Sequence, residues 1–411
     1  MPILVLMIAI MPFEFNPHLV LAESMLGFPQ FTAIKLLGLV GLGWVVTELG
    51  AGRASLRLGE APQLRAFGLY LAIALVSGLT RAAGLLVVSN FLAVCALMPI
   101  VLVAVRDEQK LRTIIKACVV TMMVVYVYAV RQMGRYDGPL GVGLNDVNYF
   151  ALMLVLVLPL PFAYAGSAAT RRSRILWSLG GIALLAQIIQ TGSRGGFLAL
   201  AAVALVVGLR LSRRPVRTFG GQVAAVIVLA LVLPTPLVSR LLAGEEATGI
   251  QRSNEARMIA LDAGLRMIAA NPVMGVGSGN FGLYKQVWAD AFPEGPNLAH
   301  NTYIELAAEL GLPALAAFLF LIWRTFRSLR RAERRAVAAG RETVARTAIA
   351  FQASLVGYLV GAFFLSAQYE NFFWLIVFLS VCIERIAASA PVPHVSPATI
   401  APGRVGLRWA R

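Results

Sequence analysis

Long apolar blocks alternate with short polar segments along the chain, and most blocks are close in length to a membrane-spanning helix. A helix needs about 20 predominantly apolar residues to cross the hydrocarbon core of a bilayer. The blocks lie near residues 1 to 13, 31 to 49, 66 to 84, 87 to 105, 113 to 130, 148 to 166, 175 to 191, 195 to 211, 220 to 238, 303 to 323, 347 to 367 and 371 to 388. The pattern predicts an all-α integral membrane protein with about a dozen transmembrane helices.

Basic residues gather in alternate connections between these blocks. The clusters lie at residues 53–65, 106–116, 171–174, 210–217 and 324–346, and in the tail at 404–411. By the positive-inside rule, these connections and both termini are predicted to be cytoplasmic. The other connections, of which the longest covers about residues 239–302, then face outward. We treat residues 1–389 as a single membrane domain and the Pro- and Ala-rich residues 390–411 as a disordered cytoplasmic tail.

Composition narrows the class of protein further. The 411 residues are 59% hydrophobic and carry a formal net charge of +16. A nucleic-acid partner is not expected, because the basic residues lie in short clusters between apolar blocks and form no basic face on a soluble domain. The three cysteines fall inside apolar blocks without paired spacing, so neither a zinc site nor a disulfide framework is indicated. The expected surroundings are membrane lipids.

Arg194 lies in the segment TGSRGG, residues 191–196, on the predicted outer side, where topology gives no reason for an arginine. An arginine at mid-bilayer costs about 2.5 to 3.5 kcal/mol on insertion scales, so Arg194 is expected at the water interface or in a polar cavity. One interpretation is an anion clamp, in which Gly195 and its neighbouring glycines let backbone and phosphate approach closely and Ser193 caps the next helix. The alternative is an interfacial arginine that snorkels to water.

His300 lies in the segment NLAHNTYIELAAELG, residues 297–311. Thr302 and Glu305 have the spacing of a capping box, which predicts that a helix begins at Thr302 and leaves His300 in the preceding turn. His300 would face outward beside a helix N-terminus and is the best placed neutral base of the three histidines. A structural role is the alternative for a lone histidine.

An amphipathic helix is predicted within the long outer segment, ending at Asn271–Pro272. Its apolar residues recur at helical spacing and are expected at the membrane surface: Met258, Leu261, Leu265 and Ile268. Asp262 and Arg266 form an i,i+4 pair in the favoured order, whereas Arg257 has no acid three or four positions away. Arg257 is therefore predicted to be the freer cation.

Two further outer segments leave alternatives open. GVGSGN, residues 275–280, is either a flexible turn or a set of backbone N–H groups directed toward an anion, since no strand precedes it and its spacing is not that of a nucleotide fingerprint. Asn148 lies at the outer mouth of a predicted helix, where it either caps that helix or binds a substrate hydroxyl.

Acidic and histidine clusters are missing from the long outer segment. It has no D-x-D, no His–carboxylate cluster and no Ser-His-Asp set at a spacing that suggests a metal or an acyl-enzyme. If a diphosphate is handled there, arginines must supply the neutralising charge. No metal and no cofactor are expected.

Three of these motifs, in this order, resemble the O-antigen ligase and polymerase superfamily of bacterial envelope glycosyltransferases. They are TGSRGG at 191–196, the run from Arg257 to Phe281, and HNTYIELAAELG at 300–311. The resemblance implies a multi-pass enzyme of the bacterial inner membrane with a periplasmic active site. Such an enzyme moves a glycan from undecaprenyl diphosphate to an acceptor hydroxyl, with inversion and without a metal.

The resemblance also implies roles for residues of this chain. Arg194 and Arg257 match the diphosphate-binding arginines, and His300 matches the histidine thought to activate the acceptor. A negative charge develops as the diphosphate leaves, and arginines can stabilise it. The substrate-binding candidates are Ser193, Gly195, Asn301, Tyr303, Asn148 and Arg252.

The motifs do not separate the functions of this superfamily. A ligase would use the lipid A core as acceptor, and a repeat-unit polymerase would use a growing glycan. A protein O-glycosylating enzyme would use a protein. We expect the ligase, because the chain is compact and shows no added soluble domain. A transporter or flippase should show internal repeats and mid-membrane charges, and a scaffold of an export complex would leave His300 and Arg194 dispensable.

Overall fold

The computed structural model describes residues 1–13, 20–25, 28–56, 61–80, 84–132, 147–211, 220–221, 246–288 and 298–389. Its first half contains α1 (Pro2–Ile10), the 3-10 turn η1 (Met11–Phe13), β1 (Val20–Met25), β2 (Phe28–Thr32), α2 (Ala33–Gly50), α3 (Pro62–Thr80), α4 (Gly84–Ala104), α5 (Glu108–Gln132), α6 (Val147–Val157), α7 (Pro159–Gly166), α8 (Arg171–Thr191) and α9 (Arg194–Leu211). Its second half contains α12 (Glu246–Ala270), α13 (Phe281–Trp288), α14 (Thr302–Leu310), α15 (Leu312–Ala338), α16 (Glu342–Gly361) and α17 (Asn371–Ala388).

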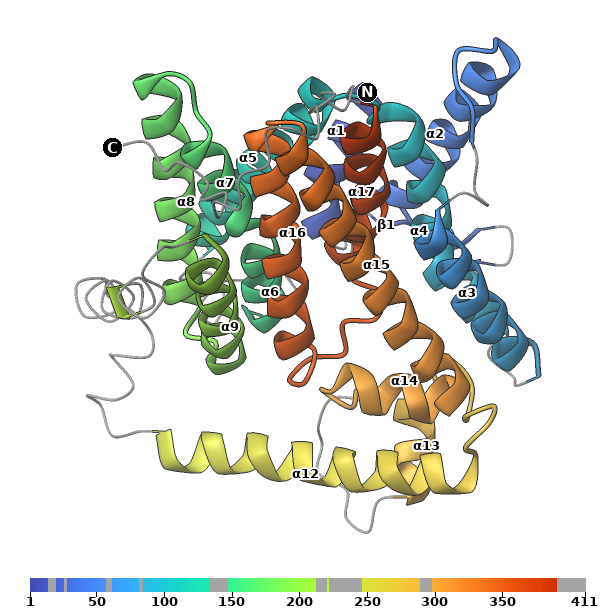
Figure 1. Ribbon diagram of the computed structural model, residues 1–411. Coiled ribbons are helices and arrows are strands. Elements are labelled where there is room, and N and C mark those ends of the chain that lie inside the picture. Colours follow the sequence, from blue (N-terminus) through green and yellow to red (C-terminus); the bar gives the residue numbers. More distant parts are fainter. Residues whose placement is uncertain are drawn as a thin grey trace, which may run out of the picture.

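Most of these helices form one bundle, and α12 runs across one end of it beside α13 and α14 (Figure 1). Eight helical segments within the described residues are long and apolar enough to cross a membrane, and α6 and α7 together form one of them. Two shorter apolar helices cover Pro2–Phe13 and Phe91–Ala104. The structure therefore gives a polytopic helical protein, as predicted, without confirming a dozen spans. The predicted span at 220–238 lies outside the described residues apart from its first two.

The described elements agree with the all-α expectation apart from one hairpin, and one predicted span needs correction. The described chain is helical except for a short hairpin, in which β1 and β2 pair antiparallel with Val20 opposite Thr32 and Met25 opposite Phe28. The predicted single span at 303–323 is two helices, because Gly311 between α14 and α15 has φ +87°. A side chain at Gly311 would place its Cβ 2.1 Å from the carbonyl oxygen of Val273, so the break is fixed by close backbone packing.

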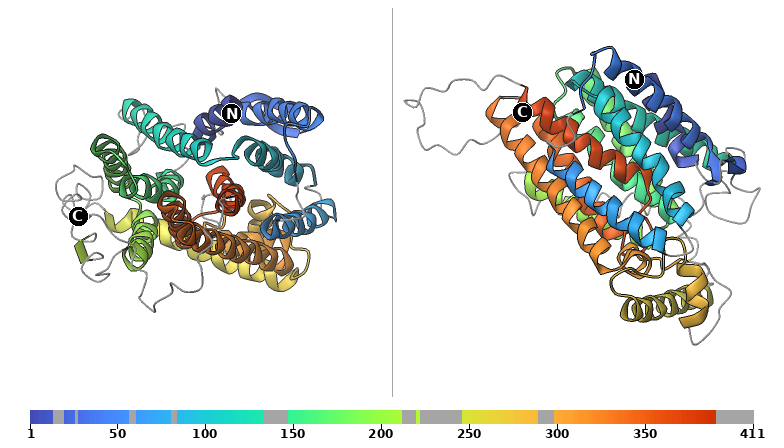
Figure 2. Two further views of the ribbon diagram at one scale, coloured as in Figure 1. Left: turned by 45° about the horizontal axis from the view of Figure 1, so that its top comes forward. Right: turned by 90° about the vertical axis from the view of Figure 1, so that its right-hand side faces the viewer.

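Helix α16 lies inside the bundle, as the tilted view in Figure 2 illustrates. In its apolar window 83% of the residues are buried, against 28% in α2 at the periphery. Gly357 and Gly361 lie one turn apart on α16 and admit neighbouring helices closely, since an added Cβ at Gly357 would lie 2.6 Å from Val155 of α6. Small residues at this spacing are a common means of close helix packing in membranes. The α16 C-terminus is therefore a well-packed position from which the next connection starts.

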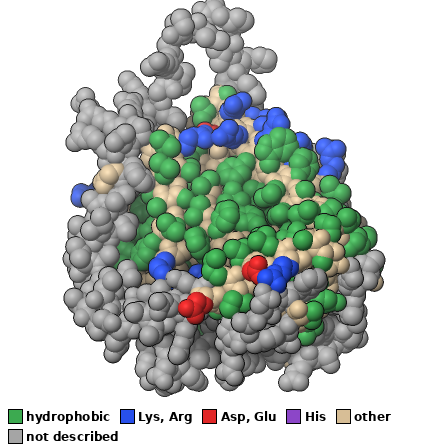
Figure 3. Space-filling view, turned by 90° about the horizontal axis from the view of Figure 1, so that it is seen from below, with side chains coloured by type: hydrophobic (Ala, Val, Ile, Leu, Met, Phe, Trp, Pro, Cys, Tyr) green, Lys and Arg blue, Asp and Glu red, His purple; other side chains and the backbone are tan. Residues whose placement is uncertain are grey.

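The bundle carries an apolar outer surface with charged borders. Figure 3 shows a broad hydrophobic face with a row of Lys and Arg side chains along one edge. Peripheral side chains such as Leu79 and Val46 are exposed, as expected for helices that contact lipid. Ion pairs join the predicted cytoplasmic connections to one another: Arg341–Glu108 at 3.1 Å, Arg210–Glu333 at 2.7 Å and Arg331–Glu384 at 2.8 Å. These connections gather at one end of the bundle, and α12 and α14 lie at the other (Figure 1).

Buried side chains form two hydrophobic clusters. The larger cluster fills the bundle around Trp374, which contacts Tyr70, Phe67 and Phe378. The smaller cluster lies under α12 and includes Ala263, Met267, Phe281 and Ala308. Helix α14 contributes to both, through Leu306 and Leu310 in the bundle and Ala308 under α12. The outer layer therefore has a core of its own, which α14 connects to the bundle.

Candidate functional site

The turn between α8 and α9 is built by the segment TGSRGG. Gly192 ends α8 in a left-handed conformation with φ +64°. The Ser193 hydroxyl accepts a hydrogen bond from the Gly196 amide at 3.1 Å, which confirms the predicted capping of α9. Side chains at Gly195 and Gly196 would crowd Phe364 and Ala151, at 3.1 and 2.8 Å from the added Cβ atoms. Both glycines are therefore needed for helix packing, whatever else approaches this turn.

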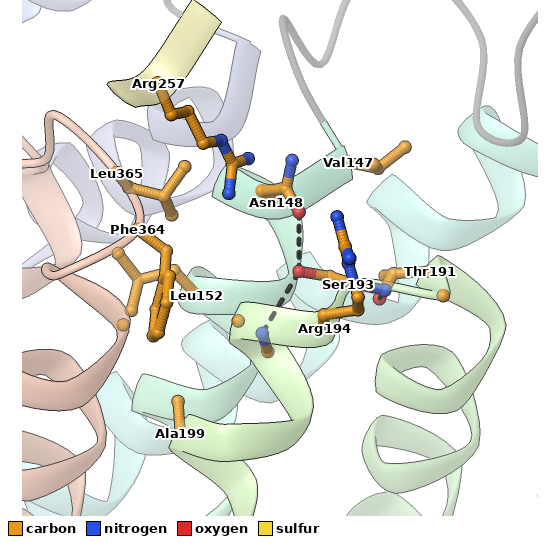
Figure 4. A pocket seen from close by; sticks show the side chains of 14 residues that line it. Val147, Asn148, Leu152, Thr191, Ser193, Arg194, Ala199, Arg257, Phe364 and Leu365 are labelled. Atoms are coloured by element: carbon orange, nitrogen blue, oxygen red, sulfur yellow. Dashed lines mark hydrogen bonds between the residues drawn. The ribbon is translucent and has the colours of Figure 1, made fainter. Parts of the chain in front are cut away.

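A cavity of about 270 Å³ opens above this turn, and Arg194 and Arg257 both line it (Figure 4). The lining comes from α6, the α8–α9 turn, α9, α12 and the connection between α16 and α17. It includes Asn148, Thr191, Arg194, Arg257, Phe364 and Leu365, and no Asp or Glu is among the described residues that line it. Two guanidinium groups from distant parts of the sequence thus face one small polar space, and the cavity favours an anion.

Asn148 is held in this cavity by a short chain of hydrogen bonds. Because the Ser193 hydroxyl already accepts from the Gly196 amide, its own hydrogen is donated to the Asn148 Oδ1 at 2.6 Å (Figure 4). The Asn148 side-chain amide therefore has a defined orientation. Ser193 and Gly195 line the same cavity, so five of the nine candidate residues meet here.

The His300 segment lies directly before α14, which begins at Thr302 as predicted. The N-cap is Asn301, whose Oδ1 accepts hydrogen bonds from the Tyr303 and Ile304 amides at 3.0 and 3.1 Å. The expectation that Thr302 caps the helix is wrong, because its hydroxyl donates to the Leu365 carbonyl at 2.6 Å. His300 has φ 49°, the one positive φ of a non-glycine residue in the described chain, and its Nδ1 is buried.

The turn before α14 is joined to a wall of the cavity. The Thr302 amide donates to the Ala362 carbonyl at 2.9 Å, and the Ala367 amide donates to the Thr302 hydroxyl at 2.9 Å. The connection bound in this way, residues 362–370, supplies Phe364 and Leu365 to the cavity. His300 itself is not among the lining residues. It lies beside the connection that forms one side of the cavity.

Two candidates near His300 make structural contacts. Asn301 caps α14, and the Tyr303 hydroxyl donates to the Leu359 carbonyl at 2.7 Å while its ring packs on Phe363. Their substrate-binding roles stay predictions. Arg252 falls in α12, outside the residues whose side chains are described.

Helix α12 carries Arg257 and ends before Asn271–Pro272, as predicted. Arg266 pairs with Asp262 at 2.9 Å, which confirms the expected i,i+4 pair. Met258 and Leu265 of the predicted apolar stripe are 65% and 51% exposed, whereas Ala260 and Ala263 are buried against the outer-layer core. Ala260, Ala263 and Met267 therefore form the packed face of α12, and Met258 and Leu265 remain available to the membrane surface.

Sequence reasoning missed two buried carboxylates on α14. Glu305 accepts hydrogen bonds from the Ala299 amide at 2.9 Å, from the Gln368 amide at 2.7 Å and from the Ser366 hydroxyl. Burial in this helix, which lies outside the membrane-spanning segments, raises the pKa of Glu305, and that of Glu309 to about 8. The signal was available: two glutamates one turn apart lie inside the apolar run TYIELAAEL.

The glycine-rich turn at 275–280 wraps around Glu309. The Gly277 amide donates to the Glu309 carbonyl at 2.8 Å, and the Phe281 amide donates to the Glu309 carboxylate at 3.2 Å. Amides in and directly after this turn thus bind oxygen atoms of the protein's own Glu309. In the described part of the chain, no group of three His, Cys, Asp or Glu side chains could hold a metal ion.

Comparison with known proteins adds one finding to this geometry. Residues 179–319 match the family model described as O-Antigen ligase. The matched segment runs from within α8 to within α15 and includes Arg194, Arg257 and His300. No curated protein matches the chain.

Proposed function

Because residues 179–319 match the family model described as O-Antigen ligase, we propose that the chain transfers a glycan from undecaprenyl diphosphate to an acceptor hydroxyl at the outer face of the bacterial inner membrane. The superfamily comprises glycosyltransferase-like membrane enzymes, and the acceptor we propose is the lipid A core. The observation that carries the proposal is the pair Arg194 and Arg257 on one cavity without a carboxylate among its described lining residues.

The two arginines supply the charge that a diphosphate leaving group needs. Two unit charges about 4 Å apart at an effective dielectric constant near 20 attract each other by about 4 kcal/mol. This attraction grows as the bond to the anomeric carbon breaks and negative charge collects on the diphosphate. Arg194 and Arg257 therefore stabilise the transition state more than the bound donor, with Asn148 as a neutral donor beside them.

The acceptor side of the reaction is assigned to His300. The acceptor oxygen attacks the anomeric carbon, the bond from that carbon to the diphosphate oxygen breaks, and the acceptor proton passes to His300. Since the Nδ1 of His300 is buried, we propose that Nε2 takes the proton of the acceptor hydroxyl. One displacement on the face opposite the leaving group inverts the anomeric centre. Arginines neutralise the diphosphate, so the proposed reaction uses no metal.

The test separates the superfamily's functions by their products. Loss of the gene should leave polymerised lipid-linked glycan in the membrane and a lipid A core without polymer. A core that carries single repeat units would indicate a polymerase instead, and an unchanged core with an unglycosylated protein would indicate protein glycosylation. Purified protein should transfer a synthetic polyprenyl-diphosphate glycan in excess EDTA. Binding of this donor without transfer would favour a transporter.

A further inference from the structure

Glu305 lies in the first turn of α14 and is buried, with 3% of its surface exposed. Both carboxylate oxygens are used. Oε2 accepts from the Ala299 amide and the Ser366 hydroxyl, and Oε1 accepts from the Gln368 amide. One side chain thus joins the residue before His300 to the connection between α16 and α17.

This arrangement holds His300 from both sides. Ala299 is bound to Glu305, and Asn301 is fixed as the N-cap of α14. Between them His300 has φ 49°, a left-handed conformation that is unfavourable for a residue with a side chain. Such a conformation persists only where the surroundings over-determine it, and it is most often found at functional positions.

The same carboxylate connects His300 to the arginine cavity. Ser366 and Gln368 follow directly after Phe364 and Leu365, which line the cavity. Thr302 binds this connection separately through Ala362, Leu365 and Ala367. The residues on either side of His300 and the cavity wall therefore share one set of hydrogen bonds, and Glu305 lies at its centre.

Glu309 provides a comparison within the same helix. It is equally buried and one turn further along, but its carboxylate accepts from the Phe281 amide in the glycine-rich turn. The hydrogen bonds of Glu309 within the described residues do not involve residues 299–302. A difference between the two glutamates therefore reports on the position of His300 and not on burial of a carboxylate.

We propose that Glu305 is a positioning residue that sets the place of the His300 imidazole relative to the arginine cavity, through the Ala299 amide on one side and Ser366 and Gln368 on the other. The catalytic consequence rests on the proposed function, because it requires His300 to act as the base. The hydrogen bonds by which Glu305 holds Ala299, Ser366 and Gln368 together do not depend on that function. Hydrogen-bond acceptance matters for this role, and the charge of Glu305 does not.

The test compares Glu305→Gln with Glu305→Ala. The oxygen of a glutamine at position 305 can still accept from Ala299 and Ser366. Its amide can donate to the Gln368 Oε1 once the Gln368 amide turns. This Oε1 is buried and has no hydrogen-bond partner in the described structure. Glu305→Gln should therefore turn over at close to the wild-type rate. Glu305→Ala should lower kcat about 10²-fold, as misplacement of a reacting group by about 1 Å does. Donor binding should survive in both, since Arg194 and Arg257 are untouched.

Glu309→Gln and Glu309→Ala are the matched controls, and Ser366→Ala is a milder variant that cuts only the contact to the cavity wall. If Glu305→Ala does not fold in detergent, Ser366→Ala should still lower kcat with donor binding intact. Equal effects of Glu305→Ala and Glu309→Ala on kcat, or a Glu305→Ala protein that is folded and fully active, would overturn the proposal.

Amide hydrogen exchange separates this inference from the proposed function. The peptide that contains residues 298–303 should exchange slowly in the wild type and in Glu305→Gln, and faster in Glu305→Ala, whether or not the protein transfers glycan. Unchanged exchange in Glu305→Ala would disprove the anchoring. A wild-type protein that transfers no glycan would disprove the proposed function and leave the exchange result to decide the anchor.

Discussion

At the scale of single residues, the site is defined by where side chains of similar chemistry are directed. Arg266 is paired with Asp262 on the surface of α12, whereas Arg257 of the same helix faces the cavity with Arg194. Ser193 is engaged in capping and in orienting Asn148. Residues of similar chemistry therefore have different roles in the structure.

The three arginines should therefore respond differently to substitution. Arg194→Lys keeps the charge but loses the planar fork, and Arg257→Ala loses both, so each should weaken donor binding roughly 10- to 100-fold, or about 1.5 to 3 kcal/mol. Arg266→Ala removes an exposed pair worth about 0.3 to 0.5 kcal/mol and should leave donor binding unchanged. Titration with a labelled polyprenyl-diphosphate glycan measures this order, and a more sensitive Arg266 would contradict it.

His300 should affect turnover and not donor binding. Removal of a general base costs mainly proton transfer, so His300→Ala should lower kcat by roughly 10²- to 10⁴-fold. The measurement is glycan transfer at saturating donor, alongside donor binding and a check of folding in detergent. Transfer at the wild-type rate would remove His300 from the mechanism.

Glu309 should make stability depend on pH. Burial raises its pKa in the folded protein to about 8 from an ordinary value of 4.5, so the folded state binds more protons between these values. Its contribution is fully present below about pH 4.5 and is lost as the pH rises through 8. Glu309→Gln resembles the protonated form and does not titrate. The Tm of the variant minus that of the wild type should therefore increase from pH 5 to pH 8. Parallel Tm curves for the two proteins would show that Glu309 does not titrate in this range.

The residues that line the cavity could be predicted where the signal is local. Arg194, Arg257 and Asn148 could be singled out from charge, topology and helix ends, and the structure brings them together. Phe364 could not be, since it reaches the site by a connection whose position depends on contacts with Thr302, over 60 positions earlier. Glu305 was assigned only a capping role, because its true partners include Ser366 and Gln368.

At the scale of elements, glycines decide where helices end and how closely they pack. The apolar pattern predicted one helix at 303–323, but the pattern continues unbroken across Gly311 and carries no information about its φ of +87°. The break turns α14 away from α15 and leaves α14 beside α12 (Figure 1). Gly311 followed by Pro313 is a local signal for the end of one helix and the start of the next, and close packing on Val273 requires this conformation.

Gly311→Ala should consequently destabilise the protein by roughly 2 kcal/mol or more, because left-handed strain adds to a clash. Gly340 is the matched control, since it has φ +66° but open space where a Cβ would lie. Gly340→Ala should show the strain alone. Thermal unfolding in detergent compares the two, and equal losses would mean that the contact with Val273 relaxes without cost.

At the scale of the whole molecule, charge separates the two ends of the bundle. The arginine-rich connections are joined by ion pairs at one end, and the cavity and His300 lie at the other. The alternation of clusters along the sequence predicts that these two ends face opposite sides of the membrane, which stays a prediction. The number of spans was less well predicted, because short and interrupted apolar blocks do not specify how deeply each enters the bilayer.

Topology can be measured directly with reporter fusions. Fusions after Arg174 and Arg335 should read cytoplasmic, and a fusion near Gly279 in the outer layer should read periplasmic. A cytoplasmic signal at Gly279 would place the cavity on the wrong side for a donor displayed in the periplasm.

The cavity with the two arginines lies between the two hydrophobic cores described above. Arg194 belongs to a helix packed on α16 in the bundle, and Arg257 belongs to α12, which rests on the smaller core of the outer layer. The spacing of the two guanidinium groups is thus set by how one layer sits on the other. A substitution in the smaller core that shifts α12 should therefore also change the distance between Arg194 and Arg257.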